Sequence, residues 1–183
     1  MTEAEFLVLI RRNPVNGVIL ERLDSLGLSD AWLVSGCLFQ TVWNVLTERP
    51  VSHGIKDYDI FYFDPDTSWE AEDNVIKRGN ALFADLAVPI EFRNQARVHL
   101  WYSEKHGRPY PPLTSSCEGI DRFLAVANMV GVNPKGDVYG PGLADMATMH
   151  LRPNRTANFR KDRYDEKNVR YKACWPELTI EAA

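Results

Sequence analysis

Two aspartates, Asp57 and Asp59, stand one residue apart at the start of an apolar run that reaches Phe63. On a β-strand, residues i and i+2 point to the same face, so both carboxylates can bind one divalent ion. Carboxylates this close repel one another and resist burial, which favours a bound cation. The alternative is two exposed aspartates at the mouth of a strand. A second Asp-x-Asp, Asp64-Pro65-Asp66, contains proline at a strand end and predicts a turn instead.

A third carboxylate, Glu91, alternates with Ile90 and Phe92 in a second apolar run. It therefore faces away from them, and it can reach Asp57 and Asp59 if the two strands are neighbours. Three carboxylates could then hold two divalent ions for an in-line displacement at phosphorus. The residues predict Mg²⁺ or Mn²⁺ as the cofactor.

A turn of small residues, Ser35-Gly36-Cys37, lies between a short apolar strand and a predicted helix. Such a turn at a helix N-terminus suits a phosphate, because the first backbone N–H groups of a helix have no intrahelical acceptor. Together with Asp57 and Asp59 it predicts a metal-dependent nucleotide site. Cys37 has no recognisable partner base, which argues against a nucleophilic thiol.

Several polar residues near these motifs have two readings each. Lys56 stands beside the aspartate pair and could meet a phosphate. Arg93 and Arg97 could bind a triphosphate or pair with acidic neighbours. Gln40 and Asn44, spaced i,i+4, could support the loop that carries the aspartates or cap local backbone.

The elements that must position these residues indicate an α/β (α+β) fold, a small mixed sheet flanked by helices. Asn13-Pro14 predicts a helix start, Gly27 a helix stop, and Thr67-Ser68-Trp69-Glu70 a capping box. Ser115 with Glu118 predicts another helix start. We expect helices at 3–11, 14–26, 38–46, from the capping box to about 84, at 118–130 and at 143–150. We expect strands at 31–35, 57–63, 88–93 and 97–102.

Two of these elements carry more detailed expectations. The helix at 38–46 should turn Val42, Val45 and Leu46 inward. The last two strands could form a hairpin around 94–96, which would make His99 a strand residue, more simply an ordinary one than a substrate contact.

The composition changes from Arg152 onward. Residues 152–172 hold eight arginines and lysines against three acidic residues, a local charge of +5 in a chain whose net charge is −4. Interleaved aromatics, Phe159, Tyr164 and Tyr171, would let this basic segment contact phosphates or single-stranded RNA. The plainer interpretation is a solvated arm that packs its aromatics on the domain. We therefore expect a domain at 1–150 and a C-terminal basic arm, helical in part, at 151–183.

The overall composition is that of a packed globule, with 45% hydrophobic residues and five tryptophans. Three cysteines, far apart, show neither zinc spacing nor a disulfide framework and predict reduced thiols in a cytoplasmic protein. The acidic N-terminus lacks a signal-peptide pattern, and no apolar run approaches the roughly 20 residues that span a bilayer.

Four runs together resemble a family of bacterial nucleotidyltransferase-like proteins within the polymerase-β-type nucleotidyltransferase superfamily. The resemblance covers most of residues 30–155. The runs are Gly36-Cys37-Leu38-Phe39-Gln40-Thr41-Val42-Trp43-Asn44, Lys56-Asp57-Tyr58-Asp59-Ile60, Asn94-Gln95-Ala96-Arg97-Val98-His99-Leu100-Trp101-Tyr102 and Tyr139-Gly140-Pro141-Gly142-Leu143-Ala144-Asp145.

The resemblance implies metal-dependent transfer of a nucleotidyl group from an NTP to an acceptor hydroxyl. Gly36 and the start of its helix would hold the phosphates, Asp57 and Asp59 the metals, and Glu91 would be third ligand and possible base. The superfamily usually has glycine or serine where this chain has Cys37, so side-chain help to the phosphate is in doubt while the backbone contribution survives.

Two other functions stay open at this point. A catalytically silent member would bind a nucleotide or a partner protein. A glycosyltransferase with an Asp-x-Asp metal site is disfavoured, because only 56 residues precede the motif. The acceptor, whether small molecule, protein or RNA, and the oligomeric state are not encoded in a readable pattern.

Overall fold

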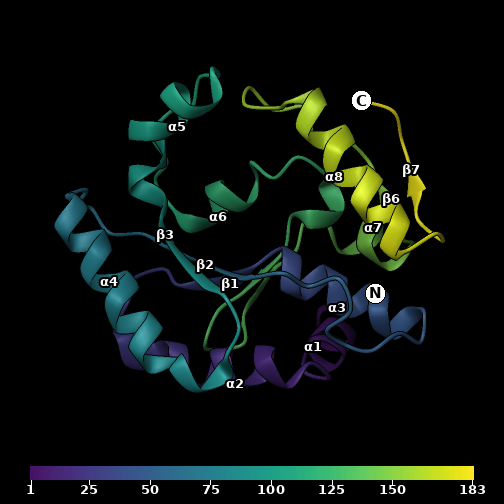
Figure 1. The fold of residues 1–183 in the computed structure, drawn as a ribbon, viewed down its shortest axis with the longest axis horizontal. Helices are drawn as coiled ribbons and strands as arrows, with labels where there is room; N and C mark the ends of the chain where they lie inside the picture. The colour runs from purple at the N-terminus through teal and green to yellow at the C-terminus, as the bar shows by residue number, and fades with distance from the viewer.

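A five-stranded mixed sheet runs through the middle of the protein, whose computed structural model describes residues 1–183 (Figure 1). Its order is β3-β2-β1-β4-β5, with β2 and β3 parallel and every other neighbouring pair antiparallel. A parallel pair, β6 and β7, forms a second small sheet. The strands are β1 (Trp32–Val34), β2 (Tyr58–Tyr62), β3 (Ile90–Asn94), β4 (Gly131–Val132), β5 (Val138–Tyr139), β6 (His150–Leu151) and β7 (Thr179–Ile180).

Helices flank this sheet, which confirms the predicted fold class. In Figure 1, α2 and α4 lie on one side of the sheet, and α5, α6 and α8 lie on the other. The helices are α1 (Glu3–Ile10), α2 (Pro14–Arg22), α3 (Gly36–Leu46), α4 (Trp69–Leu82), α5 (Val98–His106), α6 (Ser116–Ile120), α7 (Leu143–Ala147) and α8 (Lys161–Cys174). Short 3₁₀ turns occur at Leu23–Leu26, Ala84–Leu86, Gln95–Arg97 and Val126–Asn128. None of the helices is both long and apolar enough to cross a bilayer.

The N-terminal helices follow their sequence signals. Asn13 caps α2 by accepting from the Val15 N–H at 3.1 Å, and Gly27 ends the following turn with a φ of 63°. The leucines at 20, 23 and 26 are buried in the main core. Capping and apolar spacing were sufficient to predict this region.

The helix α3 is the central element of the core. Its residues from Cys37 to Asn44 are all buried, so the helix is enclosed on every side rather than along one stripe. Val42 faces inward as expected and Val45 is half-buried. The prediction for Leu46 was wrong, because its side chain lies in the last turn, beyond the enclosing elements, and is 48% exposed.

The expected strand at 97–102 was wrong, and with it the hairpin and the placement of His99 on a strand. This segment is α5, entered through a 3₁₀ turn that the Asn94 side chain caps by accepting from the Ala96 N–H at 3.1 Å. The apparent alternation concealed a helical period, because Val98, Trp101 and Tyr102 share one face. They pack around Tyr110 and Leu113 in a small cluster separate from the main core.

The expected helix at 118–130 also ends far sooner, since α6 stops at Ile120. Distant side chains bind the carbonyl groups that a longer helix would have used. Asn154 donates to the Asp121 and Phe123 carbonyls, both at 2.8 Å, and Asn158 donates to the Arg122 carbonyl at 3.2 Å. These bonds span more than thirty residues, so the local sequence could not reveal them.

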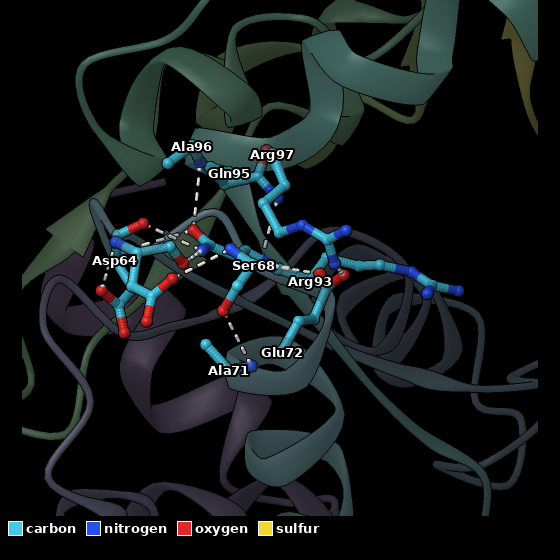
Figure 2. Close-up of polar contacts among 10 residues, drawn as sticks. Asp64, Ser68, Ala71, Glu72, Arg93, Gln95, Ala96 and Arg97 are labelled. Atoms are coloured by element: carbon cyan, nitrogen blue, oxygen red, sulfur yellow. Dashed lines mark hydrogen bonds and ion pairs between the residues drawn. The ribbon is translucent and has the colours of Figure 1, made fainter.

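A polar network fixes the ends of β2 and β3 (Figure 2). Asn94 accepts from the Asp64 N–H at 3.0 Å and donates to the Asp64 carbonyl at 2.9 Å. Asp64 and Asp66 each cap a backbone N–H two residues on, which confirms that the second Asp-x-Asp is a turn. The cap of α4 is Ser68, which accepts from the Ala71 N–H; the predicted capping box placed this start one residue too early.

The loop from α3 to β2, which leads to Asp57, is held by Asn44. Its amide donates to the Val51 carbonyl at 3.0 Å and to the His53 carbonyl at 2.8 Å, and its oxygen accepts from the Trp175 indole at 2.9 Å. Of the two readings of this asparagine, the structure confirms loop support.

Replacing Asn44 with alanine should therefore destabilise the protein. Two partly buried carbonyls and one buried indole N–H would lose their partner, at a cost of about 2–4 kcal/mol in the free energy of unfolding. Asn74→Ala is the matched control, because Asn74 is exposed on α4. Chemical denaturation measures both variants, and equal stabilities would contradict the assigned role.

Candidate functional site

The strands β2 and β3 bring two of the predicted site residues into register. Asp59 is paired with Glu91, and Phe61 with Arg93. Tyr58, Ile60 and Tyr62 point into the core, so Asp59 and Phe61 lie on the opposite face of the sheet. The sequence-based expectation that the two strands are neighbours is confirmed.

Burial and neighbouring negative charges both disfavour the ionised form of Asp59. Burial first, then the negative charges of Asp57 and Glu91, raise the pKa of Asp59 from 3.8 to about 7. Lys167 and Arg93 oppose this shift. Asp59 therefore lies close enough to Asp57 and Glu91 to be influenced by both charges.

The turn at Ser35 lies next to these carboxylates, because Val34 is paired with Asp59 across β1 and β2. Ser35 has φ 55° and ψ −110°, a region that side chains other than glycine rarely adopt. Its N–H donates to the Val130 carbonyl at 2.9 Å, and its carbonyl accepts from the N–H groups of Leu38 and Phe39. Such strain is stored where the surrounding structure over-determines it, often at functional sites.

The first two N–H groups of α3, those of Gly36 and Cys37, precede the intrahelical hydrogen-bond ladder. Gly36 also leaves room for its neighbours, since a Cβ there would lie 3.3 Å from Nε2 of Gln40. The turn thus presents backbone donors next to the carboxylates, an arrangement that suits a phosphate.

The side chain of Cys37 turns away from this turn and into the core. It is fully buried, and its thiol donates to the Val34 carbonyl at 3.8 Å. Burial, reinforced by the charge of Asp59, raises the pKa of Cys37 well above its ordinary value. Its role is packing, which leaves the phosphate contact to the backbone.

The carboxylates have the donor chemistry of a magnesium or manganese site, but they are not gathered into a coordination shell. No group of three or more His, Cys, Asp or Glu side chains is placed to enclose a metal ion. Glu91 accepts from Nη2 of Arg93 at 2.7 Å. The hard oxygen donors and like charges of Asp57 and Asp59 have the chemistry that fits a divalent cation, whereas Glu91 is held by Arg93.

The two predicted side-chain contacts to phosphate differ in their surroundings. Arg97 forms an ion pair with Glu72 of α4, and both side chains are only 13% exposed (Figure 2). It therefore ties α5 to α4 and is not brought together with the carboxylates. Lys56 is exposed and forms no ion pair, so its ammonium group is free.

A cleft of about 450 Å³ opens beside Asp59, between residues of α5, α6 and α8. The sequence did not indicate it, because its walls come from parts of the chain far apart. Besides Asp59, its charged lining consists of Arg93, Arg122, Arg160, Arg163 and Lys167.

The cleft face of α8 carries three of these cations. Arg160 at the N-cap, Arg163 and Lys167 recur at helical spacing, beside the stripe formed by Tyr164, Asn168 and Tyr171 that α8 buries. The basic segment thus packs its aromatics on the domain and turns some of its charges toward the carboxylates. This spacing is a signal that sequence reasoning could have used.

Lys167 is the α8 cation that interacts with Asp59. It remains accessible to solvent but stands inside the cleft, where desolvation lowers its pKa and the charge of Asp59 partly restores it. Arg160 and Arg163 pair with Asp162 and Glu166, whereas Lys167 has no carboxylate within ion-pair distance.

Replacing Asp59 with asparagine should stabilise the metal-free protein at high pH. Between pH 4 and 7 the folded protein keeps a proton that the unfolded chain has lost, so stability falls as the pH rises, and the penalty is complete above pH 8. The variant should gain about 1–3 kcal/mol at pH 8 and almost nothing at pH 4. Urea denaturation in EDTA at both pH values measures this, and an equal gain at both would contradict the assigned pKa.

Comparisons with known proteins agree with this geometry. A protein whose NMR structure is described as revealing a CCA-adding enzyme head domain superimposes with a TM-score of 0.75 at 26% identity, over 98% of this chain and 96% of that one. No curated protein sequence matches the chain. A family model described as nucleotidyltransferase matches residues 21–180. The chain therefore belongs to the nucleotidyltransferase family and has its fold.

Proposed function

We propose that this protein transfers a nucleotidyl group from an NTP to an acceptor hydroxyl with Mg²⁺ or Mn²⁺. The observation that carries the proposal is the pairing of Asp59 with Val34 on one side and Glu91 on the other. It sets a carboxylate cluster beside a strained turn with free backbone donors, which is what phosphoryl chemistry needs. Membership of the nucleotidyltransferase family and the likeness to a CCA-adding enzyme head domain support nucleotidyl transfer as the class of reaction.

Each residue has a role that follows from its position. The N–H groups of Gly36 and Cys37 bind phosphate oxygens, and Ser35 fixes the turn. Lys56 contacts the phosphates from the side of the site that faces solvent. Asp57 and Asp59 hold the metal, which when bound would neutralise charge on the reacting phosphates. Arg97 has no part in this site, because it is held by Glu72.

The reaction forms one bond and breaks one. The acceptor oxygen bonds to the α-phosphorus while the bond from that phosphorus to the bridging oxygen breaks, and pyrophosphate leaves. The hydroxyl proton passes to Glu91 or to water. Glu91 can accept the proton only after separating from Arg93. This ion pair is exposed, so breaking it costs little free energy.

A member that binds nucleotide without catalysis is the second candidate. The ion pair between Glu91 and Arg93 and the lack of a gathered metal shell favour it. Activity and binding assays separate the two functions.

Changing Asp57 or Asp59 to asparagine should lower transfer by about two orders of magnitude or more, because the metal ligand and its charge are lost. The assay follows label from α-labelled NTPs into acceptors of a cell lysate with Mg²⁺ or Mn²⁺. Asp66→Asn is the matched control, since Asp66 lies in the turn after β2 and an asparagine there can still accept from the Ser68 N–H. Full activity of both site variants would refute the assignment.

Thermal shift assays test binding apart from chemistry. A ligand at a hundredfold excess over its dissociation constant stabilises the folded state by about 2.7 kcal/mol. Millimolar Mg²⁺ with an NTP should raise the Tm, and Asp59→Asn should remove most of that rise. A rise that Asp59→Asn leaves intact would indicate nucleotide binding without metal chemistry, the second candidate.

A further inference from the structure

The cleft beside Asp59 has the electrostatic character of a site for a polyanion. Five cationic side chains line it against a single carboxylate. Arg93, Arg160 and Arg163 form ion pairs only with exposed acids, and a phosphate can replace such surface pairs at little cost. The other two, Arg122 and Lys167, pair with no carboxylate.

The same cleft presents aromatic rings that are half-exposed rather than buried. Phe61 and Phe123 are stacked on the sheet side, with centroids 5.6 Å apart and planes at 18°. Trp101 and Tyr102 of α5 line it as well. Arginines and lysines together with accessible rings bind a phosphate and a base at once, because any base can stack on an aromatic face.

The cleft reaches Asp59 but is separate from the turn. Its lining includes Asp59, Phe61 and Arg93 of β2 and β3, but no residue of the Ser35-Gly36-Cys37 turn. If the turn holds the phosphates of the NTP, the cleft remains for the second substrate. An in-line displacement requires the acceptor to approach the phosphorus opposite the leaving group.

We infer that this cleft is the acceptor site and that the acceptor is a nucleoside phosphate. Its base stacks on the rings of Trp101 and Tyr102, its phosphate pairs with Arg163 and Lys167, and its hydroxyl is directed toward Asp59 and Glu91. That the bound nucleotide is the acceptor rests on the proposed function, whereas nucleotide binding by the cleft does not. The volume suits about one nucleotide, which can be free or the last unit of an RNA strand.

Binding can be measured without metal and without NTP. The probe is a ribotetranucleotide labelled at its 5′ end, followed by fluorescence anisotropy in EDTA, with AMP and tripolyphosphate as unlabelled competitors. Wild type should bind, AMP should compete, and tripolyphosphate should compete far less, because it has charge but no base. The unlabelled tetranucleotide is a third competitor. If AMP competes as strongly as the tetranucleotide does, the ligand is a free nucleotide. If the tetranucleotide competes much more strongly than AMP, the ligand is the end of an RNA strand.

Two kinds of variant test the two halves of the site. Arg163→Gln with Lys167→Gln, both exposed on α8, should weaken binding about tenfold and reduce its dependence on salt. Trp101→Leu should weaken it about tenfold with the salt dependence unchanged. Lys161→Gln is the matched control, because Lys161 lies on the same helix outside the cleft and pairs with Asp165.

Unchanged binding in the α8 double variant would overturn the inference. So would tripolyphosphate competing as well as AMP with no effect of Trp101→Leu, since the cleft would then recognise charge alone. If the protein binds the probe through these residues but transfers no label, the nucleotide site stands and the proposed transfer is refuted.

Discussion

The burial of Asp59 among like charges, where β2 pairs with the edge strand β3, is the constraint on which the site depends. Parallel pairing of β2 and β3 sets Asp59 opposite Glu91, and burial raises the pKa of Asp59 to about 7. A fold has no reason to hold such a cluster for stability alone, because an unpaired buried charge costs free energy. The neighbouring elements therefore have to supply compensation, and Arg93 and Lys167 do so from β3 and α8.

The helix α8 links this compensation to the core. One stripe, Tyr164 and Tyr171 with the following Trp175, belongs to the main hydrophobic cluster, and the adjacent stripe faces the cleft. Because the two stripes share one rigid helix, the packing of the aromatics fixes where the cations stand. The basic segment thus forms part of the site in space, although its amino-acid composition differs from that of the preceding domain.

Local signals predicted much of this architecture. Caps and apolar spacing predicted the N-terminal helices, an apolar run predicted β2, alternation predicted β3, and the proline in Asp64-Pro65-Asp66 predicted a turn. Errors arose where distant groups decide the structure. Side chains of Asn154 and Asn158 end α6, and the packing of Val98 and Trp101 on the segment after α5 makes a helix of what looked like a strand. The cleft was invisible for the same reason, since three separated helices build it.

The hydrogen bond from the Trp175 indole to Asn44 joins residues 131 apart in the chain. Contacts over such separations carry a large loop-closure cost and slow folding. In a ribosome-bound chain the side-chain oxygen of Asn44 has no indole partner until residue 175 has been synthesised and has emerged. The loop in front of the aspartates therefore lacks its full support until Trp175 has emerged, and the nascent protein cannot complete its site before then.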